Sequence, residues 1–260
     1  LIKQGVSEPS LITAAGPRFE RGKELADRYG IAFGTENGPA SKEADIVVLS
    51  VKPQRLAKVL VSLRDHVRRD ALVLSIVAGA SISGISAGMN HVRIVRAMPN
   101  TPAQIGEGIS VWTAAPEVSD EQIEQAKIVL GAMGEQIQVE EENYLDMATA
   151  LSGTGPAYVF LFMEAMIDAG VHLGFPRRIA EQLVRQTVRG SVDFYIHRDV
   201  HVARLRNEVT SPGGTTAAAL YFLEKAGFRT AISRAVWAAY ERSRELGSGG
   251  NAHAPEKPQE

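Results

Sequence analysis

The chain has 260 residues, of which 45% are hydrophobic and 22% charged, and it carries a formal net charge of -2. This size allows an ordinary buried core and predicts two domains, while the small net charge argues against a nucleic-acid-binding protein. Without cysteine there are no disulfides and no thiolate chemistry. The longest apolar stretch, residues 157–163, is too short for a membrane span and no signal peptide is visible, so we expect a cytoplasmic protein.

Residues 1–141 alternate short β-type runs with helical ones. Residues 1–5 read as a helix end closed by glycine, and we therefore expect an upstream segment to be missing. Strands without polar alternation, separated by helices, predict an α/β fold with a doubly wound, Rossmann-type parallel sheet covered on both faces, its first strand missing. The predicted strands are 10–13, 31–33, 46–51, 72–77, 92–97, 108–113 and 136–139, and the predicted helices are 18–29, 56–63 and 120–133.

The β signal ends after residue 142, and residues 142–247 form a second, all-helical domain. Its long apolar helices are expected to bury part of their surface against another subunit. Residues 248–260 are rich in Gly, Pro and charge, and are predicted to be a disordered tail. The predicted helices are 143–150, 156–173, 176–195, 200–209, 215–226 and 228–246.

Residues 210–220 contain the most informative run of the chain. Pro212 presets one φ angle, and the two glycines that follow let backbone amides turn toward a ligand. Thr215 or Thr216 is expected to cap the next helix, whose free N–H groups would suit a carboxylate. The alternative is an ordinary turn between two helices with an ordinary N-cap.

Three further segments directly follow predicted strands, at residues 50–54, 77–79 and 98–102. Ligands of open parallel sheets bind outside the carboxyl ends of the strands, so these segments indicate a binding edge. For Lys52 the alternative is a solvated lysine in a turn. The glycine-rich phosphate loop expected between the first strand and first helix of a dinucleotide fold is absent.

The run at 210–220 resembles the signature of the pyrroline-5-carboxylate reductase family, and the three segments after the strands also resemble family segments, in the same order. The resemblance covers roughly residues 1–247. It implies NAD(P)H-dependent reduction of 1-pyrroline-5-carboxylate to L-proline, the last step of proline synthesis. It also implies a homodimer or ring of dimers through the helical domain, with no nucleic-acid or membrane partner.

The resemblance also implies site residues. Thr216 would contact the ring nitrogen of the substrate through its hydroxyl and serve as the catalytic residue. Asp199 stands where the family often has a substrate-side glutamate, although it could be only a helix N-cap. The residues implied for the substrate carboxylate are Ser211, Gly213, Gly214, Thr215 and Thr216. Those implied for the cofactor are Asn37 at the adenosine ribose and Val51, Lys52, Pro53, Ala78, Gly79 and Asn100 around the nicotinamide.

Cofactor choice depends on residues 13–18, which contain no acidic residue to bind the ribose 2′-OH of NAD. Thr13 and Arg18 could instead bind a 2′-phosphate. This favours NADPH and leaves NADH as the alternative, and Arg18 could also be a solvated helix residue. The six histidines lack metal-ligand spacing, so no metal is assigned.

Two alternative functions are another two-domain reductase and a cofactor-sensing protein. Other two-domain reductases, acting on 3-hydroxy acids or 6-phosphogluconate, use a lysine on an interdomain helix, but no lysine occurs between Glu142 and Lys225. A non-catalytic, cofactor-sensing protein on the same fold is supported by the absent phosphate loop.

Overall fold

The computed structural model describes residues 1–247 and divides the chain into two compact units. The first unit contains Leu1–Thr154 together with the described residues from 239 onward, and the second contains Gly155–Ala238. The chain therefore leaves the first unit after Thr154 and re-enters it at Ala239. The predicted disordered tail, 248–260, lies outside the described residues.

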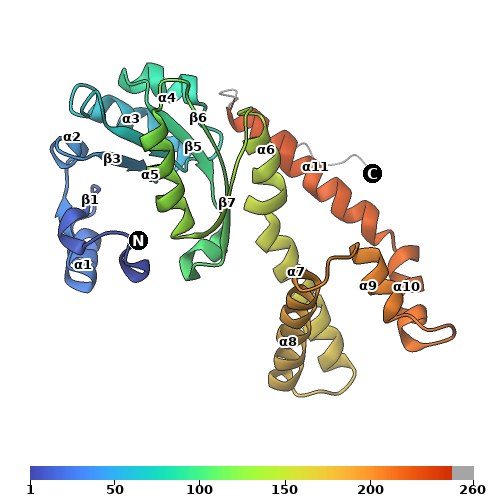
Figure 1. Cartoon of the computed structure of the whole chain (residues 1–260). Coiled ribbons are helices and arrows are strands. Elements are labelled where there is room, and N and C mark those ends of the chain that lie inside the picture. Colours follow the sequence, from blue (N-terminus) through green and yellow to red (C-terminus); the bar gives the residue numbers. More distant parts are fainter. Residues whose placement is uncertain (248–260) are drawn as a thin grey trace, which may run out of the picture. The chain divides into compact units, whose positions relative to one another are not determined.

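The first unit contains a five-stranded sheet (Figure 1). Its strands, in spatial order, are β3 (Ile46–Leu49), β4 (Leu72–Ser75), β5 (Ile94–Met98), β6 (Gly108–Ala114) and β7 (Gly134–Gln138). All five were predicted to within about two residues. β3, β4 and β5 are parallel neighbours, as the sequence indicates.

The prediction of a parallel sheet is wrong for one pair, because β6 runs antiparallel to β5. Residues 99–107 join these two strands and contain only a short 3-10 helix, Thr101–Ile105. A parallel crossover needs a dozen or more residues, so this connection can only reverse the chain. β7 is again parallel to β6, with α5 (Asp120–Gly131) between them.

The sheet is buried on both faces. Val73 on β4 packs in a cluster with Leu60 of α3 (Pro53–Leu63) and Ile85 of α4 (Ile82–Met89). Its neighbours Leu72 and Leu74 pack in a second cluster with residues of α5. Three successive strand residues with 0% exposure confirm the doubly wound arrangement.

Helix α4 was not predicted, because Gly84 and Gly88 weaken its helical pattern. The structure gives a reason for Gly88: a Cβ there would lie 2.6 Å from Leu60 Cδ1, so glycine permits close packing of α4 on α3. Ser81 caps α4 by accepting a hydrogen bond from the Gly84 N–H. Helix α2 (Asn37–Ser41) was also not predicted.

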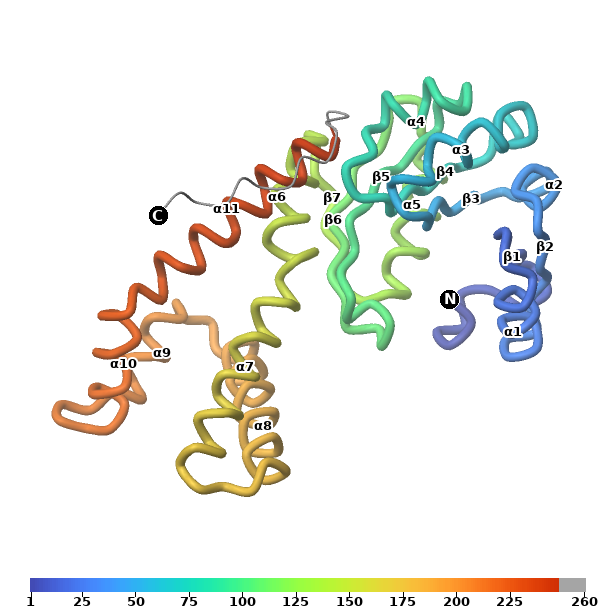
Figure 2. The backbone as a smooth tube through the Cα atoms, turned by 180° about the vertical axis from the view of Figure 1, so that it is seen from behind, coloured from blue at the N-terminus to red at the C-terminus, as the bar shows by residue number. Residues whose placement is uncertain are grey.

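A separate two-stranded sheet precedes the five-stranded one (Figure 2). It pairs β1 (Thr13–Ala15) with β2 (Ala32–Gly34) in parallel, joined by α1 (Phe19–Tyr29). The strand predicted at 10–13 is wrong in position, because Pro9–Leu11 form a 3-10 turn. Pro9 begins that turn with its fixed φ, and the strand starts after it. Residues 1–5 form a 3-10 turn ended by Gly5 at φ 67°.

The second unit is helical, as predicted. It contains α7 (Gly155–His172), α8 (Arg177–Ile196), α9 (Val202–Glu208), α10 (Thr215–Lys225) and most of α11 (Phe228–Gly247). Helix α7 is preceded, within the first unit, by α6 (Tyr144–Ala148) and a π-helical turn at Thr149–Gly153. α7 packs on α8, where a Cβ at Gly170 would lie 3.1 Å from Ala180 Cβ.

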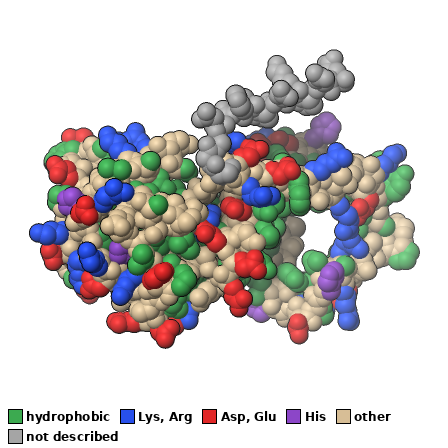
Figure 3. Space-filling view, turned by 90° about the horizontal axis from the view of Figure 1, so that it is seen from above, with side chains coloured by type: hydrophobic (Ala, Val, Ile, Leu, Met, Phe, Trp, Pro, Cys, Tyr) green, Lys and Arg blue, Asp and Glu red, His purple; other side chains and the backbone are tan. Residues whose placement is uncertain are grey.

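Large apolar side chains of the second unit are exposed. Phe160, Leu161 and Phe222 expose 61%, 67% and 67% of their surface. By length and composition, the helical segment Tyr144–His172 is apolar enough to cross a membrane, a property that core helices of soluble proteins share. On the face seen in Figure 3, acidic and basic side chains are interspersed and form no single basic patch.

Candidate functional site

The carboxyl ends of β3, β4 and β5 bring three predicted cofactor segments to one edge of the sheet. Val51, Lys52 and Pro53 follow β3, Ala78 and Gly79 follow β4, and residues 99–100 follow β5. The Ile76 N–H donates to the Leu49 carbonyl at 3.0 Å, so the first two segments leave the sheet side by side. Parallel pairing thus gathers these residues where ligands of such sheets bind.

The segment after β3 is shaped by Pro53. Lys52 is the N-cap of α3 with extended φ and ψ, and Pro53 occupies the first helical turn. Proline fits there because its missing N–H would have no partner within the helix. Lys52 is exposed and Val51 half-buried. The exposed lysine beside a helix N-terminus makes this end of the segment electropositive.

The segment after β4 turns at Gly79, which has φ 71°. That conformation favours glycine, and here there is also little space for a side chain. A Cβ on Gly79 would lie 3.2 Å from both the Leu246 Cβ and the Gly247 backbone nitrogen. The last turn of α11 therefore packs on this loop.

Two predicted cofactor residues have side chains engaged within the protein. Asn100 Oδ1 accepts a hydrogen bond from the Ile109 N–H at 3.0 Å and braces the reversal between β5 and β6. Asn37 Nδ2 donates to Ser62 Oγ at 3.0 Å, which ties the start of α2 to α3. Asn37 is the first residue of α2.

Thr13 is the first residue of β1, and Arg18 ends the connection from β1 to α1. Both are exposed, and Arg18 occupies the N-cap position of α1 without making a side-chain cap. The guanidinium of Arg18 thus lies near the carboxyl end of β1, whereas Thr13 begins that strand.

The predicted substrate segment, Ser211 to Thr216, is the turn between α9 and α10. Gly213 has φ 72°, as expected for a glycine turn. The predicted threonine cap is wrong: Gly214 is the N-cap, and Thr215 and Thr216 are the first two helical residues. Gly214 has the extended backbone of an N-cap, and a side chain there would collide with Ser211, since a Cβ would lie 2.5 Å from the Ser211 Oγ.

The start of α10 is consequently left without a side-chain cap. Free N–H groups at a helix start attract anions, and here the half-buried Thr216 stands beside them. The Thr210 hydroxyl donates to the Arg206 carbonyl at 2.7 Å and closes α9 against the turn. The turn thus presents backbone donors beside the hydroxyls of Ser211 and Thr216, a combination suited to a small carboxylate.

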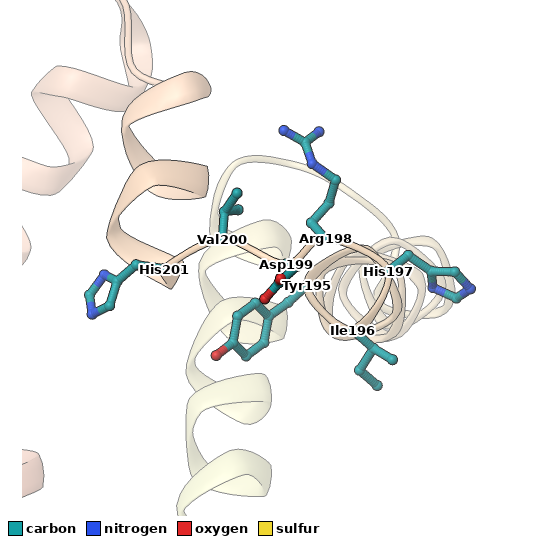
Figure 4. Close-up of a pocket in the computed structure, with 7 residues that line it drawn as sticks. All are labelled: Tyr195, Ile196, His197, Arg198, Asp199, Val200 and His201. Carbon is teal, nitrogen blue, oxygen red and sulfur yellow. The ribbon is translucent and has the colours of Figure 1, made fainter.

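Asp199 lies elsewhere, in the turn between α8 and α9 (Figure 4). A shallow hollow there is lined by residues 195–201. Asp199 is exposed beside Tyr195, whereas His197 and His201 point away from each other. The N-cap of α9 is His201, whose Nδ1 accepts from the Ala203 N–H at 3.2 Å, so the alternative role of Asp199 as that cap is wrong.

Helix α9 separates Asp199 from the turn at 211–216. Ser211, Gly213 and Gly214 thus share one turn with the threonines, whereas Asp199 belongs to the preceding turn, between α8 and α9. Residues 1–247 contain no group of three or more His, Cys, Asp or Glu side chains arranged to hold a metal ion.

Sequence reasoning overlooked Arg96. It lies inside a strand that was correctly predicted as buried, and its side chain is only 6% exposed. An arginine between apolar residues of a central strand signals a buried ion pair, since an unpaired charge there would be costly.

Comparison with known proteins identifies the family. Residues 142–246 match the family described as pyrroline-5-carboxylate reductase dimerisation. Residues 1–79 match the one described as NADP oxidoreductase, coenzyme F420-dependent. The chain is 42% identical over 247 residues to pyrroline-5-carboxylate reductase of Synechocystis, covering 95% of this chain and 92% of that protein.

The chain belongs to the pyrroline-5-carboxylate reductase family. It is 35% identical to the Escherichia coli reductase, over 95% of this chain and 91% of that protein. Among solved structures, the Coxiella burnetii reductase matches with a TM-score of 0.84 and 35% identity, over 92% of this chain and 89% of that one. Pyrroline carboxylate reductase of Plasmodium falciparum, with NADP bound, matches with a TM-score of 0.82 and 34% identity, over 90% and 87%.

The chain is thus an NAD(P)-dependent oxidoreductase that reduces 1-pyrroline-5-carboxylate to proline, and the function and fold that the resemblance implies are confirmed.

Proposed function

We propose that this reductase binds NADPH at the carboxyl edge of β3, β4 and β5, with the nicotinamide beside Lys52, Gly79 and Asn100. The observation that carries this proposal is the convergence of three strand ends on one edge. The small or proline-fixed residues at these strand ends let backbone approach a flat ring. Asn37 contributes at the adenosine ribose through its amide, held by Ser62.

Thr13 and Arg18 bind the 2′-phosphate and make NADPH the preferred cofactor. Support comes from the exposure of both residues and from the absence of an acidic residue between 13 and 18. A guanidinium matches phosphate geometry with two parallel hydrogen bonds. The NADP bound to the Plasmodium falciparum relative is consistent with this preference.

The substrate carboxylate binds free backbone amides in the segment from Gly213 to Thr216 and the Ser211 hydroxyl. The Gly214 N–H donates to the Ser211 carbonyl at 3.1 Å, so Gly214 contributes by ordering the turn. Support comes from the uncapped start of α10 and the positive φ of Gly213. The Thr216 hydroxyl contacts the ring nitrogen. Asp199 is retained as a second substrate-side residue at its own turn, on the family resemblance alone.

Catalysis then requires little chemistry from side chains. The protonated imine is already electrophilic, and hydride adds to its C5 while the nitrogen keeps its proton. The protein contributes orientation of the two reactants and polar groups fixed before reaction. Thr216 stabilises the nitrogen as its charge changes.

A homodimer, or a ring of such dimers, forms through the helical domain in the cytoplasm. Support comes from the dimerisation family match over 142–246 and from the exposed apolar side chains of α7 and α10. Obligate interfaces are apolar in this way. We assign the apolar segment Tyr144–His172 to this contact rather than to lipid, and assign no nucleic-acid partner.

The direct test is imine-dependent loss of NADPH absorbance, followed by detection of proline. Replacing NADPH by NADH at equal concentration measures the cofactor preference. Binding of NADPH without turnover would favour a cofactor-sensing protein instead.

A further inference from the structure

Arg96 is a buried cation that belongs to neither the proposed cofactor site nor the proposed substrate site. It lies on β5 with 5% exposure, between Val95 and Ala97, which are 0% and 1% exposed. Burying a guanidinium is costly unless charge and hydrogen bonds compensate it. Arg96 should therefore have carboxylate partners close by.

The guanidinium binds two carboxylates from the segment that follows β7. Arg96 Nη1 donates to Glu142 Oε1 at 2.8 Å, and Nη2 lies 3.4 Å from Asp146 Oδ1. The carboxylate side chains are 32% and 20% exposed. The planar guanidinium carries several N–H donors in a fixed geometry, so it reaches both carboxylates at once. The ammonium of lysine is a single compact charge without this geometry.

Each carboxylate also binds a second element. Glu142 Oε1 accepts from the Ile82 N–H at 2.8 Å, at the start of α4. Asp146 Oδ1 accepts from the Ser243 hydroxyl at 2.9 Å, on α11. Arg96 therefore joins β5 to α4, α6 and the end of α11, all within the first unit.

These elements also contact the loops proposed for the nicotinamide. α4 begins directly after the loop of Ala78 and Gly79, and Leu246 packs on Gly79. The π-helical turn that follows α6 packs on the last residue of β5, since a Cβ at Gly153 would lie 2.8 Å from Met98 Cε. A shift of α4 or α11 would therefore move the loop after β4, and a shift of the turn after α6 would move the end of β5.

We propose that Arg96 is a positioning residue for hydride transfer. Through Glu142 and Asp146 it fixes the loops after β4 and β5 in the geometry that the nicotinamide ring requires. This inference rests on the proposed cofactor site. Arg96 itself touches neither reactant in this account, so its removal disturbs alignment rather than binding.

The test replaces Arg96 by lysine, which keeps the charge but loses the fixed geometry of the donors. We expect kcat to fall about tenfold, because misplacement of reactants by about 1 Å can cost up to about 100-fold. The Kd for NADPH from fluorescence titration should stay within about threefold, since the other cofactor contacts are intact. The primary isotope effect on kcat, with NADPH deuterated at the transferred hydrogen, should rise as hydride transfer becomes slower.

The control is Leu130→Ala, which opens a cavity under α5 and lowers stability while leaving the contacts of Arg96 with Glu142 and Asp146 in place. Its isotope effect should equal that of the wild type. An Arg96→Lys enzyme whose kcat falls only with its folded fraction, at an unchanged isotope effect, would overturn the proposal.

If Arg96→Lys does not fold, Glu142→Gln provides the same test. The glutamine oxygen can still accept from the Ile82 N–H, but the charge facing Arg96 is gone. A rise in its isotope effect supports the proposal, and an unchanged value overturns it. Wild-type enzyme without imine-dependent NADPH oxidation would instead refute the proposed function, before any variant is compared.

Discussion

Ser211 and Gly214 lie so close in the turn before α10 that a Cβ on Gly214 would come 2.5 Å from the Ser211 Oγ. The Gly214 N–H also donates to the Ser211 carbonyl at 3.1 Å. The absence of a side chain at 214 therefore fixes where the Ser211 hydroxyl lies relative to the free N–H groups of α10.

Gly214→Ala should consequently weaken substrate binding. The added methyl group must displace Ser211, and overpacking of this kind costs about 1–3 kcal/mol. We expect the KM for the imine to rise about tenfold while the Kd for NADPH is unchanged. Gly190→Ala is the matched control, because a Cβ there meets nothing within 4 Å. Equal KM values for both variants would remove this turn from the substrate site.

Thr216→Ala should lower kcat/KM for the imine by roughly 30- to 150-fold, equivalent to about 2–3 kcal/mol. The lost hydroxyl is proposed to contact the ring nitrogen, where charge changes during reaction. NADPH affinity should hardly change. Thr215→Ala is the control, because only the backbone of Thr215 is proposed to act. Steady-state kinetics decide, and a Thr216 variant within a factor of two of wild type would remove the residue from the mechanism.

The pH dependence of stability should come in part from the buried His91. Burial lowers the pKa of His91, and the charge of Arg93 adds to this effect, while Nε2 donates to the Ala71 carbonyl at 2.8 Å. The folded state therefore binds this proton more weakly than the unfolded chain, whose histidine titrates near about 6.5. The contribution of the neutral His91 to the free energy of unfolding is therefore fully present above that pH and is lost as the pH falls below it.

The measurement is urea unfolding between about pH 5 and 7. One such group contributes at most about 1.4 kcal/mol per pH unit to the slope of the unfolding free energy. His91→Gln keeps a donor without a titrating ring and should unfold with a shallower pH dependence than wild type. His172→Gln, at an exposed position on α7, serves as control. Parallel slopes for wild type and His91→Gln would contradict this account.

Leu161→Asp should weaken the dimer. Leu161 is 67% exposed on α7, within the region matched to the dimerisation family. A carboxylate buried in an apolar interface is costly, so we expect a shift toward monomer in sedimentation. Val61→Asp, at a residue equally exposed at 68% on α3, should leave the oligomer intact. A folded, active wild-type monomer at micromolar concentration would refute the proposed assembly.

The sequence predicts the fold well where its physical signals are local. Apolar runs such as the one at β4 give the strands, and proline and glycine positions give most helix ends. The reversal between β5 and β6 depends on how few residues join them, and periodicity does not reveal direction. Helix α4 was not predicted because its glycines lower the helix propensity of the segment, although Gly88 is needed for close packing on Leu60.

The candidate site shows the same division. Segments after parallel strands could be placed on one edge from topology alone. The N-cap of α10 could not be assigned from the sequence, because Gly214, Thr215 and Thr216 are all residue types found at N-caps. The reason that position 214 is a glycine is the nearby Ser211 hydroxyl, which only the structure shows. The partners of Arg96 lie 46 and 50 residues away in sequence, and no local pattern connects them.

Arg18→Ala should reduce discrimination between NADPH and NADH. Arg18 is exposed at the N-cap of α1 and is proposed to bind the 2′-phosphate that NADH lacks. We expect the Kd for NADPH to rise about tenfold, because a charge-assisted hydrogen bond contributes about 1.5–3 kcal/mol, while the Kd for NADH is unchanged. The control is Arg21→Ala, since Arg21 is paired with Glu24 at 2.6 Å on the same helix. Because salt screens such contacts, the difference between the two cofactors should shrink as ionic strength rises. Equal losses for NADPH and NADH in the Arg18 variant would show that this residue does not read the phosphate.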